Sequence, residues 1–243
     1  MGSTDQRKLR ALILQHEDPT PPGHVMEWLR AHEAEIEILR IDLDDREIDP
    51  ADYDLIVSLG SEYAAFDDTK PFVVREATLM RRAVDDDVPI LGLCFGGQLL
   101  ARVLGADNYR GEIAEIGWLP VRSEDAQLVP EGPWFQWHFD TFTKPPGAAV
   151  IATTDAGLQA FVAGRSLGLQ FHPEVTTDIM DEWVRVYRHE LDGDGVDPDA
   201  LLEQTKRLAD ASRQNALQLF EHFYSDVAKL DERAGARDER AAG

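Results

Sequence analysis

The side chain with the clearest chemical potential in this sequence is the thiol of Cys94, in the segment Leu-Gly-Leu-Cys-Phe-Gly-Gly-Gln at residues 91–98. The segment contains Gly-x-Cys-x-Gly directly after a predicted strand and at the start of a predicted helix. This is the nucleophile-elbow pattern with cysteine in place of serine. The helix start favours the thiolate, and the backbone N–H of Phe95 points to where an oxyanion would form. The alternative is a structural cysteine beside packing glycines, and the flanking strand and helix favour a reactive thiol.

A nucleophilic cysteine needs a base, and His172 is the histidine best placed to supply one. It ends a predicted strand in Gly-Leu-Gln-Phe-His-Pro-Glu at residues 168–174, where Pro173 stops the strand. Glu174 can accept a hydrogen bond from the imidazole and hold its tautomer, as in a triad. Alone, His-x-Glu at a strand end is more typical of a surface pair. The histidines in predicted loops and helices are expected to face solvent or to cap helices: His16, His24, His32, His189 and His222.

The elements that must position these groups differ between the two halves of the chain. In the first half, short apolar runs alternate with amphipathic stretches, which predicts parallel strands joined by right-handed helical crossovers. The predicted strands lie at residues 11–14, 35–41, 54–59 and 89–93, and the predicted helices at 24–34, 72–83 and 96–104. The predicted fold class is therefore α/β, with an open, mostly parallel sheet flanked by helices.

The second half is predicted to begin with strands and to end in helices. The predicted strands lie at residues 112–121, 134–142, 149–153, 158–162 and 166–171, and the last two are expected to pair across a short turn. From about residue 178 the pattern is helical, with an apolar stripe formed by Ala216, Leu219, Phe220, Phe223, Val227 and Leu230. This acidic section is expected to pack on its own domain rather than to act as a docking arm or lid. The tail after residue 231 is expected to be frayed.

The composition limits the partners and the compartment. The chain has 243 residues, of which 43% are hydrophobic, and its formal net charge is −22. Such a negative charge argues against nucleic acids and anionic membranes as partners. The single cysteine excludes an intrachain disulfide and fits a reducing compartment. Neither a signal peptide nor an apolar segment of membrane-spanning length is recognised, so a cytoplasmic protein is expected.

The two motifs together resemble the class I glutamine amidotransferase family, over residues 10–182. They are Gly-x-Cys-x-Gly-x-Gln and, later, Gln-Phe-His-Pro-Glu. The resemblance implies a flavodoxin-like or Rossmann-like domain, which leaves residues 183–243 as a helical C-terminal extension. It implies that Cys94 attacks the side-chain amide of glutamine, that His172 protonates the departing ammonia, and that Glu174 orients His172. It further implies a glutamyl thioester that water hydrolyses.

The resemblance extends to other positions with departures. The family's second oxyanion donor lies in a Gly-Gly-Pro loop, which reads Leu-Gly-Ser around Gly60, so the loop is expected to be reshaped. Gln98 corresponds to a glutamine that contacts substrate, although a helix-surface role is its alternative. Trp137 and His138 lie where the family lines its glutamine pocket. A metal site at His138 and Asp140 is poorly supported by two ligands on one strand, and neither a metal nor a cofactor is predicted.

Within the family, the chain looks most similar to stand-alone proteins that resemble the amidotransferase part of GMP synthetase. The segments that carry this likeness lie at residues 115–118, 136–138 and 170–174. The sequence has no Ser-Gly-Gly-x-Asp-Ser motif and no Walker A motif, so activation of an acceptor is expected to need a separate synthetase subunit. Two alternatives stay open. One is a free-standing hydrolase of γ-glutamyl amides or peptides with the same triad, and the other is a catalytically silent binding protein. The presence of all three triad residues argues against the silent protein.

Overall fold

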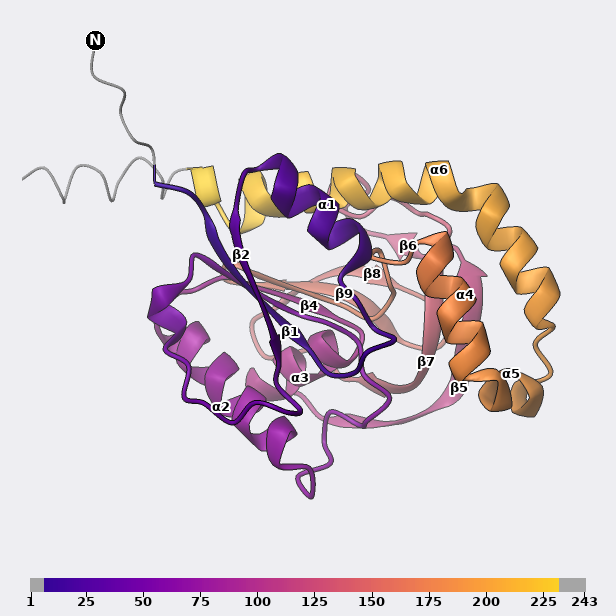
Figure 1. The fold of residues 1–243 in the computed structure, drawn as a ribbon, viewed down its shortest axis with the longest axis horizontal. Helices are drawn as coiled ribbons and strands as arrows, with labels where there is room; N and C mark the ends of the chain where they lie inside the picture. The colour runs from indigo at the N-terminus through magenta and orange to yellow at the C-terminus, as the bar shows by residue number, and fades with distance from the viewer. Residues whose placement is uncertain (1–6, 232–243) are drawn as a thin grey trace, which may run out of the picture.

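The computed structural model describes residues 7–231 and places helices on both faces of a central sheet (Figure 1). Within these residues the main sheet has eight strands in the order β2-β1-β3-β4-β10-β9-β8-β6. Its strands are β1 (Arg10–Gln15), β2 (Glu35–Arg40), β3 (Leu55–Ser58), β4 (Ile90–Leu93), β6 (Arg122–Ser123), β8 (Ala149–Thr153), β9 (Leu158–Ala163) and β10 (Ser166–Leu169). The pairs from β2 to β10 are parallel, and those from β10 to β6 are antiparallel. The expected open, mostly parallel α/β sheet is confirmed.

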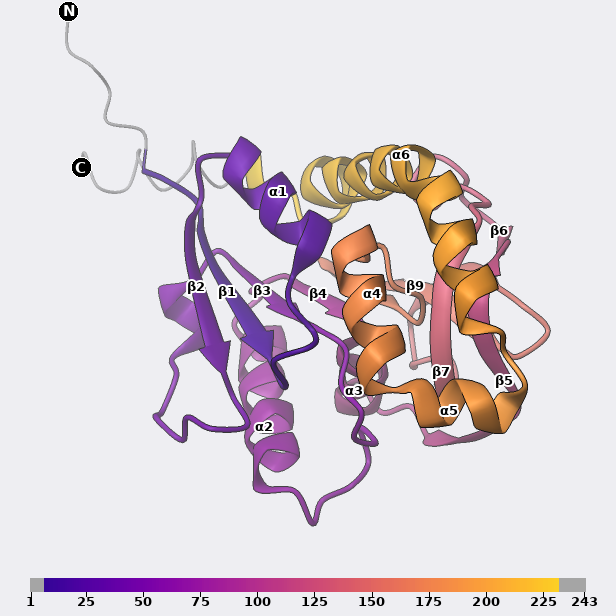
Figure 2. The ribbon, with the colours of Figure 1, turned by 45° about the vertical axis from the view of Figure 1, so that its right-hand side comes forward.

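A second, antiparallel sheet pairs β5 (Asn108–Leu119) with β7 (Trp134–Phe142). The helices are α1 (Gly23–Ala31), α2 (Pro71–Asp85), α3 (Phe95–Val103), α4 (Thr177–Val186), α5 (Arg188–Asp194) and α6 (Pro198–His222), with a short 3-10 turn at Pro50–Asp52 and a π-helical turn at Phe223–Val227. Figure 2 shows α4 and α5 beside β5 and β7, with α6 crossing above them. An apolar cluster that includes Trp118, Phe135 and Trp183 joins these elements.

Strand alternation divides the main core into two layers. Successive side chains of a strand point to opposite faces of the sheet. Ala11 and Ile13 of β1 pack in the cluster that contains α1 and α6, whereas Leu12 and Leu14 pack in the cluster that contains α2 and α3. The short apolar runs of the sequence are therefore strands that are buried on both faces, as parallel strands usually are.

The end of β10 shows why the predicted strand at 166–171 is two residues too long. Antiparallel pairing of β9 with β10 is confirmed, and it ends at Leu169. Beyond it, the backbone N–H of Gln170 still donates to Gln159, but that of His172 donates to the carbonyl of Phe135 in β7, at 2.8 Å. The chain therefore leaves the main sheet and crosses towards the second one, which carries His172 into the space between them.

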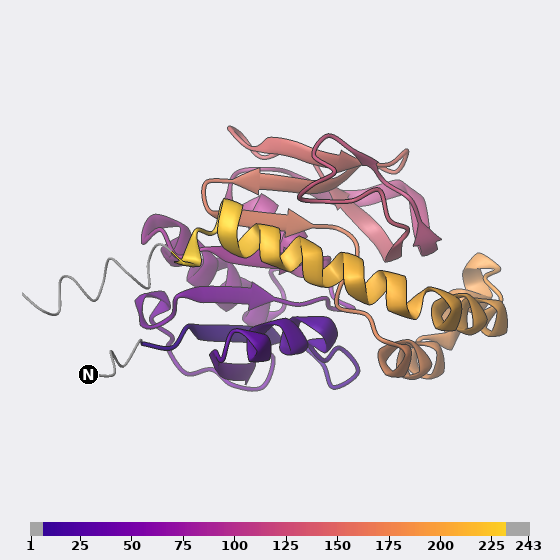
Figure 3. The ribbon, with the colours of Figure 1, turned by 90° about the horizontal axis from the view of Figure 1, so that it is seen from above.

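The helical section after β10 contacts the main sheet side of the protein through α6. Helix α6 runs beside α1 along one face of the main sheet (Figure 3). Trp28 of α1 lies against Phe220, with 5.3 Å between the ring centroids, and Ala216, Leu219 and Phe223 are fully buried. The proposed division after residue 182 lies inside α4 and stays a prediction, and the tail predicted to be frayed lies outside the described residues. No helix in residues 7–231 is long and apolar enough to cross a membrane.

Candidate active site

Cys94 lies on a sharp turn between β4 and α3, as the motif predicts. Its backbone φ is 50° and its ψ is −105°, which is strained for a residue other than glycine. The flanking glycines are needed for space. A Cβ atom on Gly92 would lie 2.5 Å from the carbonyl oxygen of Gly96, and one on Gly96 would lie 2.3 Å from that of Ser58. Cys94 is buried, with 6% of the residue exposed, at the edge where the parallel strands end.

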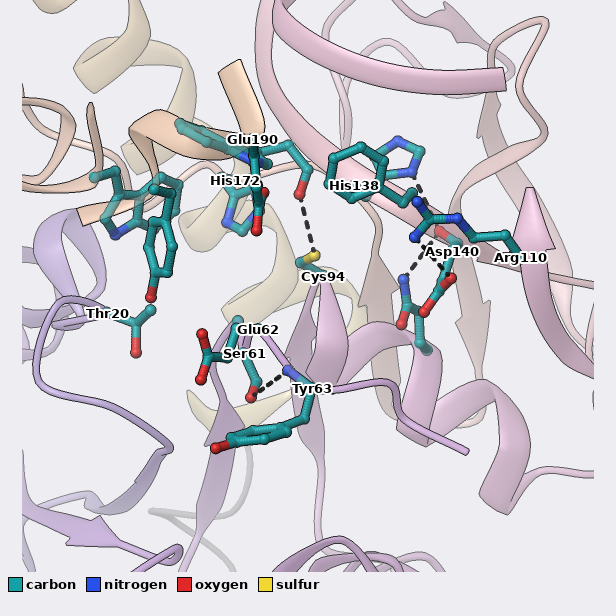
Figure 4. A pocket seen from close by; sticks show the side chains of 16 residues that line it. Thr20, Ser61, Glu62, Tyr63, Cys94, Arg110, His138, Asp140, His172 and Glu190 are labelled. Atoms are coloured by element: carbon teal, nitrogen blue, oxygen red, sulfur yellow. Dashed lines mark hydrogen bonds and ion pairs between the residues drawn. The ribbon is translucent and has the colours of Figure 1, made fainter. Parts of the chain in front are cut away.

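His172 and Glu174 lie at the same edge because β10 pairs in parallel with β4, with Leu169 opposite Leu93. The imidazole Nδ1 lies 2.7 Å from Oε1 of Glu174, and both side chains are buried. The other ring nitrogen, Nε2, is buried without a hydrogen-bond partner in the described part of the chain. His172 and Cys94 line the same pocket (Figure 4).

The charges around His172 favour its protonated form. Burial alone would lower the pKa of His172, but the carboxylate of Glu174 and the negative charge of Cys94 outweigh burial and raise the pKa to about 10. An imidazolium beside a thiolate is the arrangement that makes a cysteine reactive at neutral pH.

The pocket around Cys94 is assembled from segments that are far apart in the sequence. Figure 4 shows Cys94 between His172 and Glu190 on one side and Ser61, Glu62 and Tyr63 on the other. The lining residues are Thr20, Gly60, Ser61, Glu62, Tyr63, Cys94, Gln98, Arg110, Trp137, His138, Phe139, Asp140, His172, Trp183, Tyr187 and Glu190. They come from the loops after β1 and β3, from the turn between β4 and α3 and from α3 itself, from the second sheet, from the segment after β10, and from the region of α4 and α5.

Gln98, Trp137 and His138, which the resemblance predicts at the glutamine pocket, all line this pocket. Each is held by a hydrogen bond within the protein. The amide Nε2 of Gln98 donates to the carbonyl of Asp140 at 3.1 Å, and the indole of Trp137 donates to Glu190 at 2.7 Å. The imidazole Nε2 of His138 lies 3.0 Å from Oε2 of Glu115. Gln98 is 4% exposed, so its alternative placement on a helix surface is wrong.

Gly60 and Phe95, the predicted oxyanion donors, lie next to the thiol. A Cβ atom on Gly60 would lie 3.0 Å from Cε1 of His172 and 3.9 Å from Cβ of Cys94. Phe95 is the first residue of α3, and an N–H in the first turn of a helix has no partner within that helix. Both backbone segments therefore border the thiol. No group of three or more histidine, cysteine or acidic side chains that could hold a metal is found in residues 7–231.

Several residues at this site are not predicted from the sequence. Gln170 donates from Nε2 to the sulfur of Cys94 at 3.6 Å, and its place two residues before His172 in the motif was the available signal. Trp183 packs edge-on against His172, with 4.9 Å between the ring centroids. Trp183, Arg110 and Glu190 line the pocket from elements without a local motif, so no pattern in the sequence indicated them.

Two histidines are not where the sequence analysis expected them. His16 is completely buried and His24 is 8% exposed, and the side chain of neither one caps a helix, so the prediction that they face solvent or cap helices is wrong for both. His16 follows β1 at the buried edge of the sheet, where its ring bonds to Glu76 of α2, sixty residues away. His24 is held at the start of α1, where its backbone N–H donates to the carbonyl of Glu174.

The model of the family described as glutamine amidotransferase class-I matches residues 24–184, well over half of the chain. The chain belongs to the class-I glutamine amidotransferase family. Among solved structures, it is similar to a glutamine amidotransferase from Thermotoga maritima, with 33% identity, a TM-score of 0.82, and coverage of 89% of this chain and 98% of that one. A glutamine amidotransferase from Methylobacillus flagellatus is 26% identical, with a TM-score of 0.83 and coverage of 91% and 96%.

Curated relatives of this class-I glutamine amidotransferase include GMP synthases. One of them, a separate subunit of the glutamine-hydrolysing GMP synthase of Sulfurisphaera tokodaii, is 34% identical over 138 residues, which cover 51% of this chain and 69% of that protein. The GMP synthase of Aeropyrum pernix is 36% identical over 110 residues, which cover 40% of this chain and 21% of that protein. The match thus spans only about a fifth of the length of the latter protein.

Proposed function

We propose that this protein hydrolyses the side-chain amide of glutamine through a glutamyl thioester on Cys94. The thiolate adds to the amide carbon and forms a C–S bond, while the carbonyl electrons move to the oxygen. Collapse of this adduct breaks the C–N bond, and the nitrogen takes the proton from Nε2 of His172 and leaves as ammonia. Water then attacks the thioester and gives its proton back to His172, which releases glutamate and restores the thiolate.

One observation carries this proposal. Glu174 engages Nδ1 of His172, which leaves Nε2 as the nitrogen able to move a proton, and that nitrogen is buried without another partner among the described residues. The raised pKa of His172 keeps the proton on the imidazole until the nitrogen leaves. Cys94 shares the pocket with this imidazole and lies on the turn before α3. A structural cysteine would need neither the strained turn nor the charged neighbour.

The backbone N–H groups of Phe95 and Gly60 are the proposed oxyanion donors. Phe95 lies directly after Cys94 at the helix start, and Gly60 lies against both Cys94 and His172. Gln98, Trp137 and His138 are proposed to contact the glutamine, in keeping with their positions in the pocket lining. A nucleophilic Cys94 must stay reduced, which supports a cytoplasmic location.

The ammonia is proposed to serve a separate synthetase. The similarity to a protein that is itself one subunit of a GMP synthase supports a two-protein arrangement of this kind. In this account the isolated chain is a slow glutaminase, and docking of the partner speeds it.

A second candidate function, hydrolysis of γ-glutamyl amides, is favoured by the charge of the pocket. Three acidic residues line it, namely Glu62, Asp140 and Glu190, against two cationic groups, Arg110 and the imidazolium of His172. Burial and the charges of Glu17, Glu62 and Glu190 raise the pKa of the Tyr187 phenol. Negative charge of this density favours a substrate whose amine portion is positively charged. Free glutamine has no such portion beyond its own α-amino group.

Steady-state kinetics of the pure protein separates the two candidates. The substrates are glutamine, a γ-glutamyl amide of a neutral amine, and a γ-glutamyl amide of a diamine, with ammonia or free amine as the product measured. Slow ammonia release from glutamine, with less product from either amide, supports the synthetase-linked function. Fast release of the diamine supports the hydrolase instead, and absence of any release alongside an active control amidotransferase rejects both.

A further inference from the structure

A buried acid–base pair lies behind the pocket and takes no part in the reaction described above. The side chains of His16 and Glu76 are both 0% exposed. His16 bonds at both ring nitrogens, with Nδ1 3.0 Å from the carbonyl oxygen of Gly60 and Nε2 2.7 Å from Oε2 of Glu76. The other carboxylate oxygen of Glu76 accepts a hydrogen bond from the hydroxyl of Ser58 at 2.6 Å. The pair therefore links α2 and β3 to the loop that follows β3.

The donors and acceptors around His16 and Glu76 determine how many protons this pair holds. The carbonyl of Gly60 can only accept, so Nδ1 of His16 must carry a proton. The contact between Nε2 and Oε2 needs a second proton, on either the imidazole or the carboxyl. In both cases the pair is neutral as a whole and donates to Gly60. Burial lowers the pKa of His16, but the charge of Glu76 outweighs it, so the net shift of this pKa is upward.

The next residue along the chain holds the next part of the same loop. Oε1 of Glu17 accepts from the hydroxyl of Ser61 at 2.7 Å and from the backbone N–H of Glu62 at 3.1 Å. Two consecutive residues after β1 thus fix three consecutive residues after β3. The parallel pairing of these two neighbouring strands brings their ends together.

The loop held in this way touches the reacting groups. Gly60 lies against His172 and Cys94, since a Cβ atom on Gly60 would lie 3.0 Å from Cε1 of His172 and 3.9 Å from Cβ of Cys94. On the other side of the residue, the carbonyl of Leu59 accepts from the N–H of Gly96 at 3.2 Å, which ties the loop to α3. The peptide groups before and after Gly60 are therefore each anchored by their carbonyl, one by α3 and one by His16.

We propose that His16, backed by Glu76, is a positioning residue that holds the Gly60 loop in the geometry needed to stabilise the oxyanion. This inference rests on the proposed function of the site. A pair that served packing alone would be replaceable by apolar side chains at little cost, since burying charged groups rarely adds net stability. If the pair positions the loop, turnover should instead depend on which of the two ring-nitrogen hydrogen bonds of His16 a substitution keeps.

Two substitutions of His16 separate the bond to Gly60 from the bond to Glu76. The amide nitrogen of asparagine lies near the position of Nδ1, and that of glutamine lies near the position of Nε2. We therefore expect His16→Asn to keep the donor to Gly60 and to retain turnover within about tenfold of the unsubstituted protein. We expect His16→Gln to lose that donor and to lower kcat by about a hundredfold, with KM little changed. Glu76→Gln preserves a partner for a neutral imidazole and should behave like His16→Asn.

Two further readouts exclude simple damage to the fold. Alkylation of Cys94 by iodoacetamide forms no oxyanion, so its rate should be the same in His16→Asn and His16→Gln. Hydrogen–deuterium exchange of peptides covering residues 59–63 should be faster in His16→Gln than in His16→Asn, whether or not the protein turns over glutamine. Equal kcat and equal exchange in the two variants would overturn the inference. Absence of turnover in the unsubstituted protein, with the exchange difference present, would reject the proposed function and leave the loop anchor standing.

Discussion

The imidazole Nδ1 of His172 lies 2.7 Å from Oε1 of Glu174 across a single intervening proline. Both side chains are almost completely buried, and the second carboxylate oxygen of Glu174 has no hydrogen-bond partner in the described residues. The hydrogen bond from Glu174 therefore fixes the orientation of the imidazole, and its charge favours the protonated form. The chemistry proposed for Cys94 depends on this pair.

Glu174→Gln should impair turnover less than His172→Ala. The glutamine side chain can still accept a hydrogen bond from Nδ1 but cannot stabilise the imidazolium, so we expect kcat to fall about 10- to 100-fold. His172→Ala removes the group that moves the proton, and we expect a fall of about a thousandfold or more. The check is kcat for both variants on the substrate that the pure protein prefers. An unchanged kcat in Glu174→Gln would mean that another group orients His172.

The pH profile should carry the signature of His172. Its pKa is raised from 6.5 to about 10, so the imidazole is protonated at neutral pH and loses its proton as the pH rises through about 10. The same shift stabilises the fold fully below about pH 6.5 and progressively less towards pH 10. We expect kcat/KM to fall on the alkaline side near pH 10, and this limb should move to lower pH in Glu174→Gln. If the alkaline decrease in kcat/KM occurred at the same pH in the unsubstituted protein and in Glu174→Gln, the assignment of this decrease to His172 would be wrong.

The glycines of the turn at Cys94 should be sterically essential. A Cβ at Gly96 would lie 2.3 Å from the backbone oxygen of Ser58, which cannot move without shifting β3. We expect Gly96→Ala to lower the free energy of unfolding by about 3 kcal/mol, measured by denaturant titration. Gly193→Ala is the matched control, because no atom beyond its chain neighbours and its own helix backbone lies within 4 Å of its Cβ position, and its effect should stay within about 1 kcal/mol. Similar effects for the two substitutions would contradict the close packing at the turn.

The acidic lining should set the preference for the amine portion of the substrate. Glu190→Gln keeps an acceptor for the indole of Trp137 but removes a negative charge from the pocket. We expect kcat/KM for a γ-glutamyl diamine to fall about fivefold relative to a neutral γ-glutamyl amide. Glu203→Gln removes an exposed charge on α6 and should leave this ratio unchanged. Equal ratios in both variants would show that the pocket charge does not select the substrate.

The sequence was most informative where one short segment determines both backbone and chemistry. The turn at Cys94 needs glycines on either side, so its geometry is determined by residues that are close together in the sequence. The buried runs of the parallel sheet were equally clear, because each strand is apolar on both faces. The end of β10 was less clear, since the hydrogen bond from His172 to Phe135 depends on a strand that lies far away in the sequence.

The pair of His16 and Glu76 marks where prediction from sequence stops. His16 lies in a proline-rich loop, a setting typical of exposed residues, and Glu76 falls within the predicted helix at residues 72–83, with no motif of its own. Their contact depends on how the ends of β1 and β3 meet α2. Arg110 and Glu190 line the pocket for a similar reason, since the second sheet and α5 reach it only in three dimensions. No local sequence pattern encodes such contacts between distant elements.

Trapping of the nucleophile tests the central claim most directly. The protein is incubated with a chloro-ketone analogue of glutamine, and its intact mass is measured, followed by mapping of the modified peptide. Cys94 is the only thiol in the chain, and Cys94→Ser provides the matched control. We predict one adduct per chain, located on Cys94, which glutamine slows by competition and which Cys94→Ser does not form. Absence of an adduct, under conditions that label a known amidotransferase, would contradict the account.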